Sequence, residues 1–86
     1  MEKKIGQITH FYNRISVAAL SLTSKLEVSD RIHILGHTTD FTQNVSSMEI
    51  EHKKVVSVSP GDDVALKVIE PVRNGDEIYK ILEVIG

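Results

Sequence analysis

Three short segments of this 86-residue chain place a turn-forming residue and an aspartate directly before alternating apolar residues. They are Val28–Ile34, Pro60–Leu66 and Asn74–Ile78. Glycine adopts the positive φ that tight turns often need, and an aspartate carboxylate can accept hydrogen bonds from turn amides. The apolar residues that follow recur at every second position, which places them on one face of a strand. Three such junctions in so short a chain predict an all-β barrel or sandwich.

The composition is that of one globular domain spanning residues 1–86, with 41% hydrophobic and 26% charged residues. The chain has no cysteine, which excludes disulfides and thiolate metal sites. No apolar run approaches the roughly 20 residues that span a bilayer. The charged start, Met1–Gly6, lacks the apolar stretch of a signal peptide. We therefore expect a cytoplasmic protein that does not bind membranes.

Alternation of apolar residues predicts six strands and no helix. The first two strands are expected over residues 4–12 and 15–22, where a bulge near Ala18 or burial on both faces would reconcile a change of parity. A third strand runs through Ile32 and Ile34 and stops at Gly36. A long extended run over residues 42–52 is expected to kink at Ser46–Ser47. A helix over 45–54 is the alternative. The chain is expected to stay extended through residues 55–58. The remaining strands follow the second and third aspartate turns.

Asn74-Gly75 is the pair favoured in a two-residue hairpin, and it would set Arg73 opposite Asp76. Continued along the ladder, that register pairs Val68 with Ile81, which suits a core. It also pairs Leu66 with Glu83, which does not, and Pro71 cannot donate a ladder hydrogen bond. A turn that sends the last strand to a different partner, as barrel closure requires, fits equally well.

Motifs for catalysis are absent from the sequence. It contains no phosphate-binding P-loop, no Gly-x-Ser-x-Gly elbow and no thiol nucleophile, so we expect neither an enzyme nor a bound cofactor. Asp62 and Asp63 adjoin one another at a turn and are expected to be structural. His33, His37 and Asp40 could together hold a metal ion, but the favoured interpretation is that His33 faces outward from its strand and His37 lies in a loop.

Aromatic and basic residues adjoin in His10–Arg14, as in surfaces that stack bases and contact phosphates. The hypothesis is a small RNA-binding patch, set against Phe11 or Tyr12 filling the core instead. Its candidate residues are Lys3, Lys4, Tyr12, Arg14, Lys53 and Lys54. The net charge of −2 argues against binding nucleic acid by bulk electrostatics, so any basic surface must be local.

The order and spacing of short motifs along nearly the whole chain resemble domain II of elongation factor Tu-type translation GTPases. The motifs are Gly6, Val17-Ala18, Val28–Gly36, Val45–Ile50, Pro60–Leu66 and Arg73–Ile78. The chain is most similar to small stand-alone translation-factor-like proteins, and it is also similar to the barrel at the C-terminus of collagenase-like peptidases. It departs from the pattern at Ser29, where the family commonly has glycine, and it carries no GTPase domain.

The resemblance implies a small closed six-stranded antiparallel, Greek-key-like β-barrel. In the GTPases this domain packs on the nucleotide-binding domain and helps contact tRNA or ribosomal RNA, but no residue here matches those contact positions clearly enough to be assigned. The expected function is a non-enzymatic binding module that contacts RNA or the ribosome, without nucleotide hydrolysis. The alternative is a protein-docking accessory domain that partners a larger enzyme such as a collagenase-like peptidase. The oligomeric state stays open.

Overall fold

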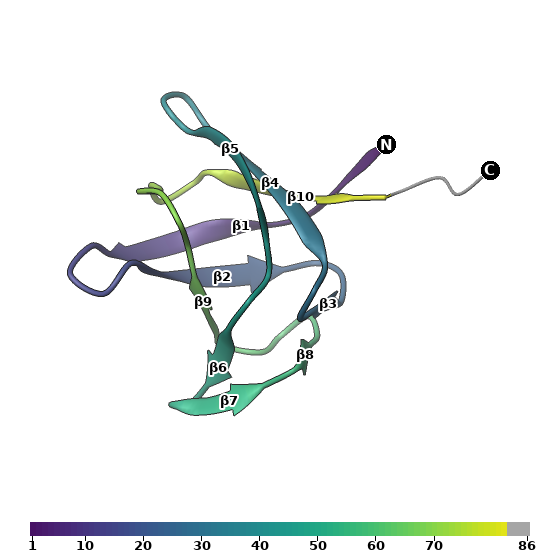
Figure 1. Ribbon diagram of the computed structural model, residues 1–86, viewed down its shortest axis with the longest axis vertical. Helices are drawn as coiled ribbons and strands as arrows, with labels where there is room; N and C mark the ends of the chain where they lie inside the picture. The colour runs from purple at the N-terminus through teal and green to yellow at the C-terminus, as the bar shows by residue number, and fades with distance from the viewer. Residues whose placement is uncertain (83–86) are drawn as a thin grey trace.

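A computed structural model describes residues 1–82 and shows an all-β fold (Figure 1). The ten strands are β1 Glu2–Tyr12, β2 Val17–Leu22, β3 Leu26–Glu27, β4 Arg31–Leu35, β5 Asp40–Asn44, β6 Met48–Ile50, β7 Lys53–Val55, β8 Ser57–Val58, β9 Val64–Lys67 and β10 Glu77–Ile81. Eight of them form one antiparallel sheet in the order β5-β4-β10-β1-β2-β9-β6-β7, and β3 pairs with β8 in a second, two-stranded sheet. No helix of the described part is long and apolar enough to cross a membrane.

The large sheet is curled, as Figure 1 shows, and its inner face packs around a core of mainly aliphatic side chains. Nearly every strand contributes to this core with alternate residues, as the sequence pattern predicts. The fully buried side chains include Ile5, Ile8, Leu26, Ile32, Ile34, Leu66 and Ile78. Burial of this aliphatic surface is the main force that holds the curled sheet together.

The predicted closed six-stranded barrel is wrong in strand number and in closure. Strands β5 and β7 are the two ends of the eight-stranded order and do not pair, so the sheet is a half-barrel. Closure fails because the expected long run over 42–52 is interrupted at residues 45–47 and then turns back at Glu51-His52. The predicted break at Ser46–Ser47 is therefore confirmed, but the strands on either side of it are too short to complete a barrel.

The last strand takes the second of the two predicted arrangements. Strand β10 pairs with β1 and β4, whereas β9 pairs with β2 and β6, so the turn at Asn74-Gly75 joins strands with different partners. The expected pairing of Val68 with Ile81 is therefore wrong, and the pairing of Leu66 with Glu83 involves a residue outside the described part. The unfavourable register and Pro71 already argued against a continuous hairpin.

The parity change in the second strand is resolved by partial burial on both faces of β2. Ala18 and Leu20 face the core, while Val17 and Ala19 are half-buried on the opposite face. The bulge lies in the partner strand rather than near Ala18, because the β1–β2 register shifts between Ile8 and His10. Strand β2 consequently presents small apolar side chains to solvent.

The three aspartate turns share one hydrogen-bond pattern. Each aspartate carboxylate accepts a hydrogen bond from the backbone N–H three residues earlier, and its own N–H donates to the carbonyl of that same residue. The carboxylate bonds join Asp30 to Glu27 (2.9 Å), Asp62 to Ser59 (2.8 Å) and Asp76 to Arg73 (2.8 Å). The structural role predicted for these aspartates is confirmed. Two hydrogen bonds, one to the carboxylate and one between backbone groups, close each turn before its strand begins.

The third residue of each turn has a positive φ, which is typical of a type II turn. The angles are 81° at Ser29, 93° at Gly61 and 95° at Gly75. Glycine adopts this conformation without strain, whereas a residue with a Cβ is disfavoured there by about 1–2 kcal/mol. Ser29 therefore keeps the turn geometry of the other two turns at a conformational cost.

Replacing Ser29 with glycine is expected to raise the free energy of unfolding by about 1 kcal/mol, because it removes the left-handed strain. Chemical denaturation monitored by circular dichroism measures the change. The matched control is Ser21→Gly in β2, which is exposed and has no positive φ, so it should be destabilising by about 0.5–1 kcal/mol. Equal losses in both variants would contradict the strain at Ser29.

Candidate functional site

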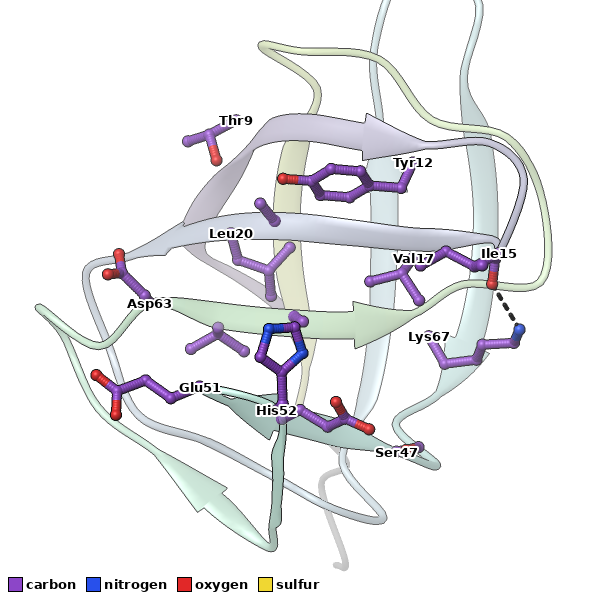
Figure 2. Close-up of a pocket in the computed structure, with 14 residues that line it drawn as sticks. Thr9, Tyr12, Ile15, Val17, Leu20, Ser47, Glu51, His52, Asp63 and Lys67 are labelled. Carbon is purple, nitrogen blue, oxygen red and sulfur yellow. Dashed lines mark hydrogen bonds between the residues drawn. The ribbon is translucent and has the colours of Figure 1, made fainter.

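A groove of about 760 Å³ crosses the outer face of the half-barrel over β1, β2, β9 and β6 (Figure 2). Its floor includes Val17, Ala19 and Ala65, which alternate along their strands with the core residues Ala18 and Leu66. The groove therefore lies on the face of the sheet that points away from the core. The alternation that builds the core also leaves these positions on the outer face.

The groove is hollow because two alanines stand side by side in the sheet. Ala19 of β2 pairs with Ala65 of β9, and Ala65 pairs with Glu49 of β6 on its other side. On its other side, Ala19 pairs with His10 of β1. Side chains at paired positions point to the same face of a sheet, so two methyl groups lie between much larger side chains.

Apolar side chains wall one side of the groove at the end of the β1–β2 hairpin. Tyr12 is 50% exposed and Ile15 is 58% exposed, and both line the groove. The ring of Tyr12 lies 4.4 Å from that of His10, measured between centroids. The hypothesis that Tyr12 fills the core is therefore wrong, whereas Phe11 packs partly against the core.

The opposite side of the groove is formed by the turn between β6 and β7. Glu51 and His52 have φ values of 50° and 64°, so both occupy the left-handed region. Two consecutive positive φ values characterise the type I′ hairpin turn, which strongly prefers Asn-Gly. Figure 2 shows the imidazole of His52 extending over β9 from this turn. The sequence pattern missed the turn because neither residue is a typical turn former.

Charge is distributed unevenly along the groove. Glu51 and Asp63 lie at one end and Lys67 at the other, as Figure 2 shows. The ammonium of Lys67 donates a hydrogen bond of 2.7 Å to the carbonyl oxygen of Ile15. Glu49 also lines the groove, and Lys54 of β7 is its direct partner in the ladder. The end formed by Glu51 and Asp63 is acidic, and neither carboxylate forms an ion pair within residues 1–82.

The six residues predicted to bind RNA lie in three separate places. Lys3 and Lys4 are at the beginning of β1, and the ammonium of Lys4 lies 2.6 Å from a carboxylate oxygen of Glu77. This contact raises the pKa of Lys4 and lowers the pKa of Glu77, chiefly through their hydrogen bond. The opposite end of β1 carries Tyr12, with Arg14 in the turn that follows.

Lys53 and Lys54 lie on β7, which β2, β9 and β6 separate from β1. Of the six residues, Tyr12 lines the groove. Lysines on an edge strand such as β7 discourage pairing with a strand of another molecule, which accounts for this pair without a ligand.

His33 lies on the outer face of β4, away from the groove, and bridges two carboxylates. Its Nδ1 lies 2.8 Å from Glu2 and its Nε2 lies 2.5 Å from Asp40, so β4 is joined to β1 and β5. These two hydrogen bonds, first that to Asp40, raise the pKa of His33. Asp40 thus lies beside His33, while His37 is exposed in the preceding loop, and no group of three metal-binding side chains suited to a metal ion occurs within residues 1–82.

The raised pKa of His33 predicts a pH-dependent stability. The folded protein binds the proton more tightly than the unfolded chain, in which the pKa is near 6.5. The extra stability is therefore fully present below the unfolded-state pKa and is lost as pH rises through the raised folded-state pKa. Because Asp40 is exposed, we expect a decrease of at most about 1 kcal/mol.

Urea unfolding of the parent and of His33→Gln measures the pH dependence of stability. It is carried out from below pH 6.5 to above the raised pKa of His33. Glutamine keeps a polar side chain but cannot be protonated, so the decrease should be absent from its profile. An identical pH profile in the two proteins would assign the dependence to other groups.

The fold and the groove define a small all-β half-barrel domain with a groove on the outer face of its sheet. No family model matches the chain. It is 39% identical over 83 residues to an uncharacterized protease of Methanocaldococcus jannaschii, a match that covers 95% of this chain and 20% of that protein. It is 30% identical over 78 residues to a collagenase of Porphyromonas gingivalis, covering 88% of this chain and 22% of that protein. The chain spans about a fifth of the length of these curated relatives.

Two crystal structures have the same fold, both of the C-terminal domain of a Geobacillus thermoleovorans protein assigned to the U32 peptidases. One has a TM-score of 0.83 at 16% identity and covers 88% of this chain and 96% of the solved one. The other has a TM-score of 0.84 at 17% identity and covers 91% of each. The chain is thus homologous to a segment of collagenase-like proteases and shares the U32 C-terminal fold. These findings support the resemblance to the peptidase barrel and not an identity with elongation factor Tu domain II.

Proposed function

We propose that this chain is a protein-docking accessory domain that binds the catalytic part of a collagenase-like peptidase. The observation that supports the proposal is the extent of the match, which includes 95% of this chain but 20% of the Methanocaldococcus protease. A segment of that size is a domain added to a larger protein. The outer groove adds a surface suited to contact with another polypeptide.

The competing function, contact with RNA or the ribosome, has weaker support. Its six candidate side chains lie in three separate places, and the ammonium of Lys4 is already paired with Glu77. The one candidate in the groove, Tyr12, shares it with the carboxylates of Glu51 and Asp63, which repel phosphates.

A docking experiment with the Methanocaldococcus protease tests the proposal. The protease is prepared without the segment of 83 residues that matches this chain, and the complex is measured by calorimetry and size-exclusion chromatography. We expect a one-to-one complex that persists after nuclease treatment. The intact protease is the control, because its own segment should occupy the docking surface and exclude this chain. No complex with the truncated protease, or a complex that nuclease destroys, would contradict the proposal.

A further inference from the structure

We infer that the groove over β1, β2, β9 and β6 binds an extended polypeptide segment that carries apolar side chains and one lysine or arginine. This inference rests on the proposed docking function and names the docking surface and the chemistry of its partner. The basic residue of the segment lies at the end marked by Glu51 and Asp63, and its apolar side chains lie on Val17, Ala19 and Ala65.

The groove is large enough to hold several side chains of a partner. Its volume of about 760 Å³ lies within the range of roughly 300–1,000 Å³ that is typical of ligand sites. The paired methyl groups of Ala19 and Ala65 leave room for side chains to enter. Tyr12 and Ile15 stand exposed beside that space, and exposed aromatic side chains in such positions commonly dominate the energy of protein interfaces.

The charged side chains of the groove favour a partner that carries a positive charge. Glu51 and Asp63 mark one end of the groove, so a cation placed there gains charge complementarity. Lys67 lies at the opposite end and already donates to the carbonyl of Ile15. A segment with a basic residue at one end and apolar residues after it matches this order, whereas a polyanion opposes it.

The turn that carries Glu51 permits a test in which binding and stability should change in opposite directions. Replacing Glu51 with asparagine and His52 with glycine supplies the favoured type I′ pair, so the midpoint of thermal unfolding should rise. The same double change removes a carboxylate and an imidazole from the groove. Loss of binding in a more stable protein cannot be explained by unfolding.

The binding experiment uses a synthetic peptide, acetyl-Lys-Val-Leu-Val-amide, titrated into isotope-labelled protein while backbone amide NMR signals are recorded. We expect shifts concentrated at Ala19, Ala65 and Glu51, and an affinity that falls as salt rises. Two comparison peptides replace the lysine with glutamate or the three apolar residues with serine, and each should bind at least about tenfold more weakly. A short uridine oligonucleotide should cause no shifts in the groove.

Three variants locate the site. The Glu51→Asn, His52→Gly double variant and the floor-filling Ala65→Leu should each weaken peptide binding about tenfold. Glu70→Lys is the control, because it changes an exposed charge among residues that do not line the groove. Thermal unfolding of each variant checks that the fold is intact.

The outcomes separate this inference from the proposed function. Absence of groove shifts up to millimolar peptide, equal binding of the three peptides, or groove shifts caused by the oligonucleotide would overturn it. If the truncated protease still binds this chain after Ala65→Leu, docking holds and the groove is not its surface. If the peptide binds but the protease does not, the groove inference holds and the proposed partner is wrong.

Discussion

Replacing Gly6 with alanine is expected to lower the free energy of unfolding by about 3 kcal/mol, the upper part of the range for overpacking a buried site. Gly6 lies in the centre of β1, where β1 pairs with β10 on one side and with β2 on the other. An added Cβ would overlap the backbone oxygen of Ser21 and would lie 3.0 Å from the Cα of Leu22. Backbone atoms cannot rotate away as side chains can, so the two strands would have to separate.

Guanidinium unfolding measures this loss, and Gly61→Ala is the matched control. Gly61 has a φ of 93° but no atom within 4 Å of an added Cβ, so its replacement adds conformational strain without a clash. We expect a loss of about 1–2 kcal/mol there. A loss at Gly6 no larger than that at Gly61 would show that β1 and β2 accommodate a methyl group.

Replacing Gln43 with alanine is expected to lower the free energy of unfolding by about 2 kcal/mol, because two partly buried backbone groups would lose their partners. Gln43 is 4% exposed and lies on β5, at one end of the large sheet. Its amide nitrogen donates to the carbonyl oxygen of Lys67 at 2.9 Å, and its amide oxygen accepts from the N–H of Ile69 at 2.9 Å. One side chain thus joins β5 to the end of β9, two strands that do not pair with each other in the sheet.

Amide hydrogen exchange gives this prediction a local measurement. The N–H of Ile69 should exchange much faster in Gln43→Ala, since the side-chain acceptor of that N–H is gone. Thr42→Ala on the same strand is the control, because Thr42 is exposed and accepts one hydrogen bond from Arg31. We expect it to change stability by less than about 0.5 kcal/mol. Unchanged exchange at Ile69 would mean that Gln43 does not hold β5 against the end of β9.

The parts of the fold that the sequence predicted depend on near neighbours along the chain. A turn such as Arg73–Asp76 is closed by hydrogen bonds within four residues, so those four residues are enough to predict it. Alternation in β4 likewise identified Ile32 and Ile34 as core residues, because side chains of a strand alternate between its faces. Even the odd turn at Ser29 was recognisable, since serine stands where the other turns have glycine.

The parts that were missed depend on pairing between distant segments. Neither Gln43 nor the Glu51-His52 turn has a sequence signal, because glutamine is rarely buried and glutamate is rarely left-handed. Ala19 and Ala65 have no distinguishing signal in the sequence. They form the floor of the groove because they are neighbours in the sheet. Of the candidate binding residues, Tyr12 was placed in the groove, whereas the lysines were dispersed by the strand order.

By itself, the sequence determined that this protein is all-β, that β4, β9 and β10 begin after aspartate turns, and that Asp30, Asp62 and Asp76 close those turns. Those properties follow from backbone conformation and hydrogen bonding over a few residues. The tertiary structure alone decided that the sheet stays an open half-barrel, that Gln43 joins β5 to the end of β9, and that a groove lies on the outer face. These features exist because β9 pairs with β2 and β6, and such long-range pairing is set by the packing of the whole core.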